Sequence, residues 1–295
     1  MKLHFWQKRV LCDFAPVICI DEKKAVVEQI SNRFDVVHFH FPPGRTEALN
    51  LPYIITQHGN SNELAELDKN TVFISKNHAD RYASDSYVYN GLDWSEYPYP
   101  LERNIKREYF HFLGNAAWRV KNVVGAIDVI KKAKSEKLKV LGGIRFNFKM
   151  GMRFTFSPKV SFEGMVGGAK KSSLLNGSKG LIFPVRWHEP FGLAIIESLY
   201  YGCPVFGTPY GSLPELVPRD VGFLSNKREE LVAAVLNSTT FSPQRCHEYA
   251  AEEFNSRKMA MEYIRKYEKV IANRPLNVGN PRLREIQKQK FLAWE

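Results

Sequence analysis

The sequence has few cysteines and no long run of apolar residues. Its four cysteines, Cys12, Cys19, Cys203 and Cys246, are scattered without a CxxC pair, which indicates neither a disulfide framework nor a zinc site. No apolar run approaches the ~18 residues that span a bilayer, and the first residues lack the apolar core and cleavage site of a signal peptide. We therefore expect a cytoplasmic globular protein whose cysteines pack as small apolar groups.

Acidic residues are also in short supply. Asp and Glu number 31 against 42 Lys and Arg, which gives a formal charge of +11. Such an excess attracts phosphates, anionic lipid headgroups or nucleic acid. No nucleic-acid recognition motif accompanies the charge, so we expect no nucleic-acid partner. The chain also lacks an Asp-x-Asp pair that would hold a divalent cation on a diphosphate, and we expect no metal or other cofactor.

The length of 295 residues accommodates two ordinary domains. Short apolar runs separated by turn residues predict buried strands at 36–41, 53–56, 71–74, 87–89, 109–113, 140–141, 181–183 and 204–206. Helical periodicity, as at Val124, Ile127 and Ile130, lies between several of them, an alternation typical of parallel sheets covered by helices. Prolines and charges interrupt the pattern at 97–108, which predicts two Rossmann-like domains, 1–106 and 107–259.

The segment from Glu189 to Val217 carries the most information. A helix is predicted to begin at Phe191-Gly192, where free backbone amides and the positive end of the helix dipole suit a phosphate. The expected phosphate ligands are the amides of Gly192, Leu193 and Ala194. Glu189 and Glu197 flank them and could accept hydrogen bonds from sugar hydroxyls. A structural interpretation stands beside this one, because Leu193, Ile196 and Tyr200 also form an apolar stripe at helical spacing.

This segment resembles the signature of glycosyltransferase family 4, retaining enzymes of the GT-B fold with an E-x7-E pattern. The resemblance implies an α/β GT-B protein with two Rossmann-like domains facing across a cleft. The N-terminal domain is shortened and lacks the usual glycine-rich loop, and a returning C-terminal helix at about 260–295 joins it. By the same resemblance Glu189 faces the hydroxyls of the transferred sugar, Glu197 binds the ribose, and Phe191 belongs to the donor site.

Further positions match the family in order along the chain. Gly114 follows a predicted strand and leads to Lys121, which the resemblance places on the donor diphosphate. Asn115 stands where the family has an arginine, and Arg119 is the candidate that replaces its charge. Met165 lies in a strand and turn that resemble those whose backbone contacts the nucleotide base.

His58 follows a predicted strand at 53–56, and ligands of open α/β sheets gather at the carboxyl ends of strands. It resembles the histidine that the family places against the donor sugar, with Gly59 allowing close backbone approach. The alternative is a histidine satisfied by neighbouring backbone. His38 and His40 lie on one face of a predicted strand, and we expect both to be packing residues.

The resemblance implies a metal-independent transfer of a glycosyl group from a nucleotide diphosphate sugar to a hydroxyl of a glycan or lipid-linked acceptor, in cell-surface polysaccharide biosynthesis. One alternative is a non-catalytic nucleotide-sugar or glycan-binding protein of the same fold. The C-terminal segment is basic and contains Arg282, Arg284, Lys288, Lys290, Phe291 and Trp294. This composition predicts either peripheral contact with the anionic inner face of the cytoplasmic membrane or a solvated helix end.

Overall fold

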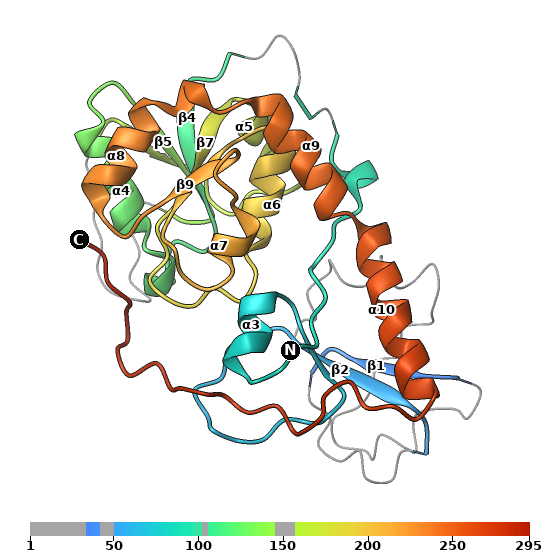
Figure 1. Cartoon of the computed structure of the whole chain (residues 1–295). Helices are drawn as coiled ribbons and strands as arrows, with labels where there is room; N and C mark the ends of the chain where they lie inside the picture. The colour runs from blue at the N-terminus through green and yellow to red at the C-terminus, as the bar shows by residue number, and fades with distance from the viewer. Residues whose placement is uncertain (1–33, 42–49, 99, 102–105, 145–156) are drawn as a thin grey trace. The chain divides into compact units, whose positions relative to one another are not determined.

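The computed structural model of the protein describes residues 34–41, 50–98, 100–101, 106–144 and 157–295 (Figure 1). Two compact units make up the chain. The first unit combines Met1–Asp93 with Phe254–Gln287, and the second combines Trp94–Glu253 with Lys288–Glu295. No helix in these described ranges is both long enough and apolar enough to cross a bilayer. Cys203 and Cys246 are buried in the second unit, whereas Cys12 and Cys19 lie outside the described residues.

The first unit contains a parallel sheet in the order β1-β2-β3, formed by Val37–Phe39, Tyr53–Gln57 and Thr71–Phe73. Helix α3 (Lys76–Arg81) follows β3, and helix α10 (Ser256–Ile271) packs against β2. The core joins both parts of the unit, since Ile54 and Val72 pack with Tyr263 and Val270 of α10. The strand predicted at 87–89 is reduced to a single bridge between Tyr87 and Phe73.

Helix α10 overlaps the start of the helix expected at about 260–295, and the apolar residues at helical spacing along it are not all buried. Met261 and Ile264 are exposed, whereas Tyr263 and Val270 are buried. The helix ends at Ile271 instead of continuing towards residue 295, because Asn273 adopts a left-handed conformation and Pro275 follows. The basic segment 282–295 is therefore not a helix end.

The second unit has a six-stranded parallel sheet in the order β6-β5-β4-β7-β8-β9. The strands are β4 (Tyr109–Leu113), β5 (Leu138–Leu141), β6 (Val160–Phe162), β7 (Ser178–Phe183), β8 (Val205–Gly207) and β9 (Gly222–Leu224). If β4 is counted as the first strand, the order is 3-2-1-4-5-6, which is the doubly wound order. The chain builds the sheet outwards in one direction from β4 to β6 and in the other direction from β7 to β9. The carboxyl ends of β4 and β7 therefore flank a switch point, where α/β proteins bind ligands.

Helices cover both faces of this sheet (Figure 1). On one face lie α4 (Val123–Lys132) and α8 (Arg228–Leu236), which contact each other, and on the other lie α5 (Gly168–Asn176), α6 (Leu193–Tyr200) and α9 (Pro243–Glu253). Short elements complete the unit: α7 (Leu213–Leu216) and the 3-10 helices η1 (Trp94–Glu96), η2 (Arg119–Lys121) and η3 (Ser238–Thr240). Buried Phe110, Phe112, Phe183 and Phe206 fill the core between the layers.

Candidate functional site

The loops after β4 and β7 are joined to each other at the switch point of the second unit. The Asn122 side chain donates from Nδ2 to the Pro184 carbonyl at 2.9 Å, and its Oδ1 caps α4 by accepting from Gly125. The Arg186 amide donates to the Val120 carbonyl at 2.7 Å. These bonds fix the two loops side by side, so their polar side chains share one region at the carboxyl edge of the sheet.

Lys121 and Glu189 form the closest charged contact in this region. Lys121 Nζ lies 2.5 Å from Glu189 Oε2, and the two side chains are only 14% and 6% exposed. Trp187 donates from Nε1 to the same oxygen at 2.8 Å. The ammonium also lies 5.2 Å from the ring centres of Phe183 and Trp187. A cation enclosed by aromatic rings and one carboxylate keeps further N–H donors for an anionic ligand.

The backbone around Glu189 is held by a close approach of Gly211. A Cβ at Gly211 would lie 2.2 Å from the Glu189 amide nitrogen, and Gly211 has a φ of +64°. Ser212 then donates its amide to the Glu189 carbonyl at 2.9 Å and its hydroxyl to the Phe191 carbonyl at 2.5 Å. Because that hydroxyl bonds to Phe191, it does not cap α7.

A Gly211→Ala variant should lose stability and donor binding together. Alanine at positive φ costs about 1–2 kcal/mol, and the added methyl group must also push Glu189 away. Gly164→Ala is the matched control, because Gly164 has a φ of +73° and nothing within 4 Å of the added atom. Urea unfolding of both variants measures the difference. A Gly211→Ala protein as stable as Gly164→Ala would contradict the close approach.

Gly192 is the N-cap residue of helix α6 and has a φ of +94°. Because glycine has no side chain, it makes no side-chain hydrogen bond to the first amides of the helix. Phe191 is buried, Leu193 is 39% exposed, and Ile196 and Tyr200 are buried. The predicted apolar stripe is therefore present except at its first residue. A helix start whose first residue is exposed, beside Lys121 and Glu189, is a suitable environment for phosphate oxygens.

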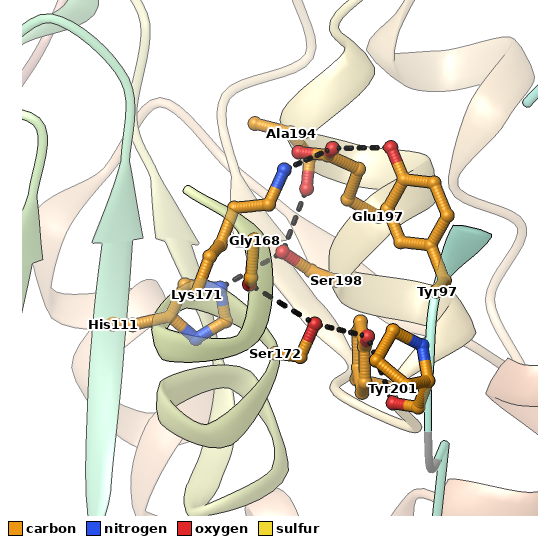
Figure 2. Close-up of polar contacts among 10 residues, drawn as sticks. Tyr97, His111, Gly168, Lys171, Ser172, Ala194, Glu197, Ser198 and Tyr201 are labelled. Carbon is orange, nitrogen blue, oxygen red and sulfur yellow. Dashed lines mark hydrogen bonds and ion pairs between the residues drawn. The ribbon is translucent and has the colours of Figure 1, made fainter. Parts of the chain in front are cut away.

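Glu197 lies one and a half turns into α6 and has two partners of its own (Figure 2). Lys171 Nζ of α5 lies 2.6 Å from Glu197 Oε1, and the Tyr97 hydroxyl donates to the same oxygen at 2.8 Å. Lys171 and Glu197 are both buried. Burial raises the pKa of Tyr97 well above its usual value, and the neighbouring Glu197 raises it further. The Glu197 carboxylate thus ties α5 and the segment before β4 to α6.

His111 of β4 connects the sheet to α6. Its Nε2 lies 2.8 Å from the Ser198 hydroxyl, which itself donates to the Ala194 carbonyl (Figure 2). Its Nδ1 lies 2.6 Å from the Ser178 hydroxyl. Burial, with Arg107 as a second cause, lowers the pKa of His111 to about 3. His111 is therefore neutral at physiological pH, with one ring nitrogen as donor and the other as acceptor.

The buried His111 should make the stability of the protein depend on pH. Because the folded-state pKa is lowered, the unfolded chain binds a proton first as the pH falls. The contribution of neutral His111 to the free energy of unfolding is complete above about pH 6.5 and is lost as the pH falls towards about 3. Urea unfolding at pH 7.5 and at pH 5.5 gives the free energy of unfolding that is lost on acidification. This loss should be smaller in His111→Gln than in the unsubstituted protein, by up to about 1.4 kcal/mol per pH unit. Equal losses would contradict a neutral His111.

The remaining donor residues predicted in the second unit are placed as follows. Gly114 directly follows β4 and packs closely against Gly142. A Cβ added at Gly142 would lie only 2.2 Å from the Gly114 carbonyl oxygen. Asn115 uses Oδ1 to accept from the Ala117 amide at 3.0 Å, so its side chain is part of a local turn. Met165 follows β6 and is 80% exposed. Arg119 is exposed in η2.

In the first unit, His58 lies in a cluster of histidines at the carboxyl ends of β1 and β2. His40 Nδ1 is 3.0 Å from His58 Nε2, and the rings of His38 and His40 stack at 4.3 Å. His38 bonds to Thr56 and Tyr267 at 2.7 and 2.8 Å. Burial lowers the pKa of His40 to about 4, and burial with His40 nearby lowers that of His58 to about 4. His40 therefore contacts the candidate site residue, in addition to its packing role. Gly59 is exposed.

The sequence analysis did not single out Trp187, Lys171 or Tyr97, which contact the candidate residues, and their sequence carried no signal for this. His40 was expected only to pack within a strand. No cluster of three or more His, Cys, Asp or Glu in the described ranges is arranged to hold a metal ion.

Residues 107–239 match the family model described as "Glycosyl transferases group 1", which covers just under half of the chain. No curated protein sequence matches the chain. The matched region contains β4 to α8, and therefore both loops at the switch point.

Several solved structures have a similar fold. The glycosyltransferase involved in Avilamycin A biosynthesis has a TM-score of 0.64 and 18% identity over 81% of this chain and 75% of that chain. Sucrose-phosphate synthase from Thermosynechococcus elongatus has a TM-score of 0.65 and 15% identity, over 81% and 74%. HepE of Anabaena in complex with UDP and glucose has a TM-score of 0.57 and 17% identity, over 76% and 73%. The α/β fold with parallel sheets is that of GT-B glycosyltransferases, and with the family match it supports glycosyl transfer in general.

Proposed function

We propose that the protein is a retaining, metal-independent glycosyltransferase of family 4 that uses a nucleotide diphosphate sugar as donor. The observation that carries this proposal is the Lys121–Glu189 pair at the switch point of the second unit, next to the uncapped start of α6 at Gly192. Cation, carboxylate and helix amides are the groups that a sugar joined to a diphosphate requires. Fold likeness alone would not assign an activity.

The proposed mechanism depends on the leaving group. Lys121 donates to the diphosphate while it keeps its bond to Glu189, because an ammonium has three N–H donors. The amides of Gly192, Leu193 and Ala194 receive phosphate oxygens at the positive end of α6. These groups stabilise the charge that grows on the diphosphate as the glycosidic bond breaks.

Sugar positioning is assigned to Glu189 and His58, and Glu197 is proposed to bind the ribose. Glu189 is held in place by Lys121, Trp187 and the Gly211 backbone, which gives it one orientation before the donor arrives. His58 is neutral at physiological pH, and a neutral imidazole carries both a donor and an acceptor nitrogen. Both Glu197 bonds end on Oε1, and we assign the ribose to Oε2. Phe191 and Gly114 are proposed as donor-site residues of the second unit, with charge added by Arg119 and contact to the base by the backbone at Met165. Gly59 of the first unit is proposed as a donor-site residue by the family resemblance.

The test is a panel of UDP-, GDP- and ADP-sugars with glycan and lipid-linked acceptors, with and without EDTA. UDP-glucose is the first donor to try, because a structure of similar fold was solved with UDP and glucose. We expect product in the presence of EDTA, with retention of the anomeric configuration by NMR. Inversion or a metal requirement would contradict the finer proposal.

A non-catalytic nucleotide-sugar binder is the second candidate, and Asn115 favours it. The side chain of Asn115 caps a turn at the position where the family resemblance expects an arginine for the diphosphate. Tight binding of a nucleotide sugar, with neither transfer nor hydrolysis across the panel, would establish the binder. Product formation would exclude it.

We also propose that the protein acts in cell-surface polysaccharide biosynthesis, at the inner face of the cytoplasmic membrane. The support is the positive charge of the chain and its basic C-terminal segment. The protein should sediment with anionic vesicles, and replacing Lys288 and Lys290 with glutamine should weaken the binding. Equal sedimentation of both proteins would contradict the membrane contact.

A further inference from the structure

The last eight residues, Lys288–Glu295, form a tail that belongs to the second unit although Phe254–Gln287 before it belongs to the first. Two backbone hydrogen bonds join Glu295 to the start of α8: the Arg228 amide donates to the Glu295 carbonyl, and the Glu295 amide donates to the carbonyl of Asn226, two residues before the helix. Tyr210 donates its hydroxyl to the Ala293 carbonyl at 2.9 Å. Leu292 and Arg186 are paired through their backbones at 2.8 Å. The tail therefore contacts loops after β7, β8 and β9, at the carboxyl edge of the sheet.

Phe291 of the tail is the shared partner of two arginines. The guanidinium carbon of Arg119 lies 5.1 Å from the centre of the Phe291 ring, and that of Arg186 lies 5.2 Å from it. Arg186 Nε also donates to the Leu292 carbonyl at 2.8 Å. Lys290 Nζ lies 5.9 Å from the same ring centre. The tail thus gathers three cations around one aromatic side chain.

Within the described part of the chain, no carboxylate forms an ion pair with Arg119 or Arg186. Two guanidiniums beside one ring repel each other, and the negative face of the ring offsets only part of this cost. Arginine forks present paired N–H donors that match phosphate oxygens. Such an arrangement is favourable when an anion binds between or beside them.

The arginines come from the same two segments as the Lys121–Glu189 pair. Arg119 and Lys121 are the first and last residues of η2, and Arg186 is the neighbour of Trp187, which bonds to Glu189. The amide of Arg186 also bonds to the Val120 carbonyl between Arg119 and Lys121. An anion bound by Lys121 would therefore lie near both arginines, because Arg119 is two residues from Lys121 and Arg186 is bonded to the residue between them.

We propose that Phe291 is a positioning residue that holds Arg119 and Arg186 together as a binding site for phosphate groups of the donor. This inference rests on the proposed function. Arg119 and Arg186, held by the tail, then supply the cationic charge that Asn115 does not.

The experiment measures the dissociation constants of UDP, GDP and ADP and of their nucleosides by calorimetry, at low and physiological salt. The variants are Phe291→Leu, which keeps apolar volume without a ring, and Phe291→Tyr, which keeps the ring. Phe291→Leu should bind the preferred diphosphate about 5- to 10-fold more weakly and should leave nucleoside binding unchanged. Phe291→Tyr should bind as the unsubstituted protein does.

A merely structural tail would weaken diphosphate and nucleoside binding alike, and that result would overturn the inference. Equal diphosphate binding by Phe291→Leu and the unsubstituted protein would also overturn it, while leaving the proposed function intact. If the unsubstituted protein binds no nucleoside diphosphate, the proposed function and this inference fail together. Should Phe291→Leu not fold, the Arg119→Gln/Arg186→Gln double variant replaces it, and unchanged diphosphate binding by that protein would overturn the inference.

Discussion

Replacing Lys121 with methionine should reduce kcat/KM for the donor sugar about 100- to 1000-fold, the usual cost of removing a group that stabilises charge in the transition state. Methionine keeps an unbranched side chain that is one atom shorter and can still pack near the rings of Phe183 and Trp187, but it removes the cation. The loss should appear mainly in kcat, because charge on the diphosphate is greatest as the sugar leaves. Initial rates over a range of donor concentrations measure both constants.

Controls separate this effect from misfolding. Lys106→Met changes a lysine that is 86% exposed and pairs with Glu108 at 3.2 Å, and it should retain full activity. In Lys121→Met the nearly buried Glu189 loses its cation, so the variant is also expected to unfold at lower urea concentration. Lys121→Met/Glu189→Gln should recover stability without recovering activity. A folded Lys121→Met protein with normal kcat would remove Lys121 from the mechanism.

Lys171→Met should lower the free energy of unfolding by about 3–5 kcal/mol, because it leaves the Glu197 carboxylate buried without its cation. The side chains of the pair are only 8% and 10% exposed. Tyr97 still donates to the carboxylate, but a neutral hydroxyl does not offset the loss of a full charge. Urea unfolding followed by tryptophan fluorescence and by circular dichroism measures the change, and agreement between the probes tests two-state behaviour.

The matched control for this prediction is Lys227→Met. Lys227 and Glu230 are 3.4 Å apart in the same unit, but they are 58% and 48% exposed, so solvent screens the pair and the unfolding midpoint should hardly move. Lys171→Met/Glu197→Gln should recover much of the stability of the parent protein. If Lys171→Met and Lys227→Met behave alike, the Lys171–Glu197 pair is not structural.

The parallel α/β architecture could be predicted because strands covered on both faces are continuous apolar runs. Residues 109–113 and 181–183 are such runs, and both are buried central strands. Strand β9 lies at the edge of its sheet and begins with Gly222, and Phe223 is 37% exposed. Its sequence therefore lacks the apolar run of a central strand, and β9 was not predicted.

Helix α10 shows how periodicity can indicate an element without its buried face. Met261, Ile264 and Val270 fit a helical stripe, but the face on the sheet is formed by Met259, Tyr263, Tyr267 and Val270. Two tyrosines contribute apolar rings to that face while their hydroxyls bond to Thr56 and His38. A sequence analysis that counts tyrosine as polar therefore assigns the buried side of the helix to the wrong residues.

The candidate residues Lys121, Glu189 and Glu197 could be singled out from the sequence, but their partners could not. Glu197 bonds to Lys171 and Tyr97, which lie 26 and 100 residues before it. These contacts depend on the strand order, which places α5 beside α6 and returns the segment before β4 to the same region. His40 and His58 meet for the same reason, since β1 and β2 are neighbours in the sheet. Residue roles at the site remain predictions that the variants above test.

The order in which the chain is synthesised gives the first unit a particular difficulty. Its strands emerge early, but Tyr263, Val270 and Leu283, which cover them, follow only after Trp94–Glu253 of the second unit has been made. Nascent β1-β2-β3 therefore exposes apolar surface on the ribosome for the time needed to translate about 160 further residues, roughly 10–30 s at ordinary rates of synthesis. Co-translational protection by a chaperone that binds apolar segments should consequently raise the yield of this protein more than that of one whose lobes are each encoded without interruption.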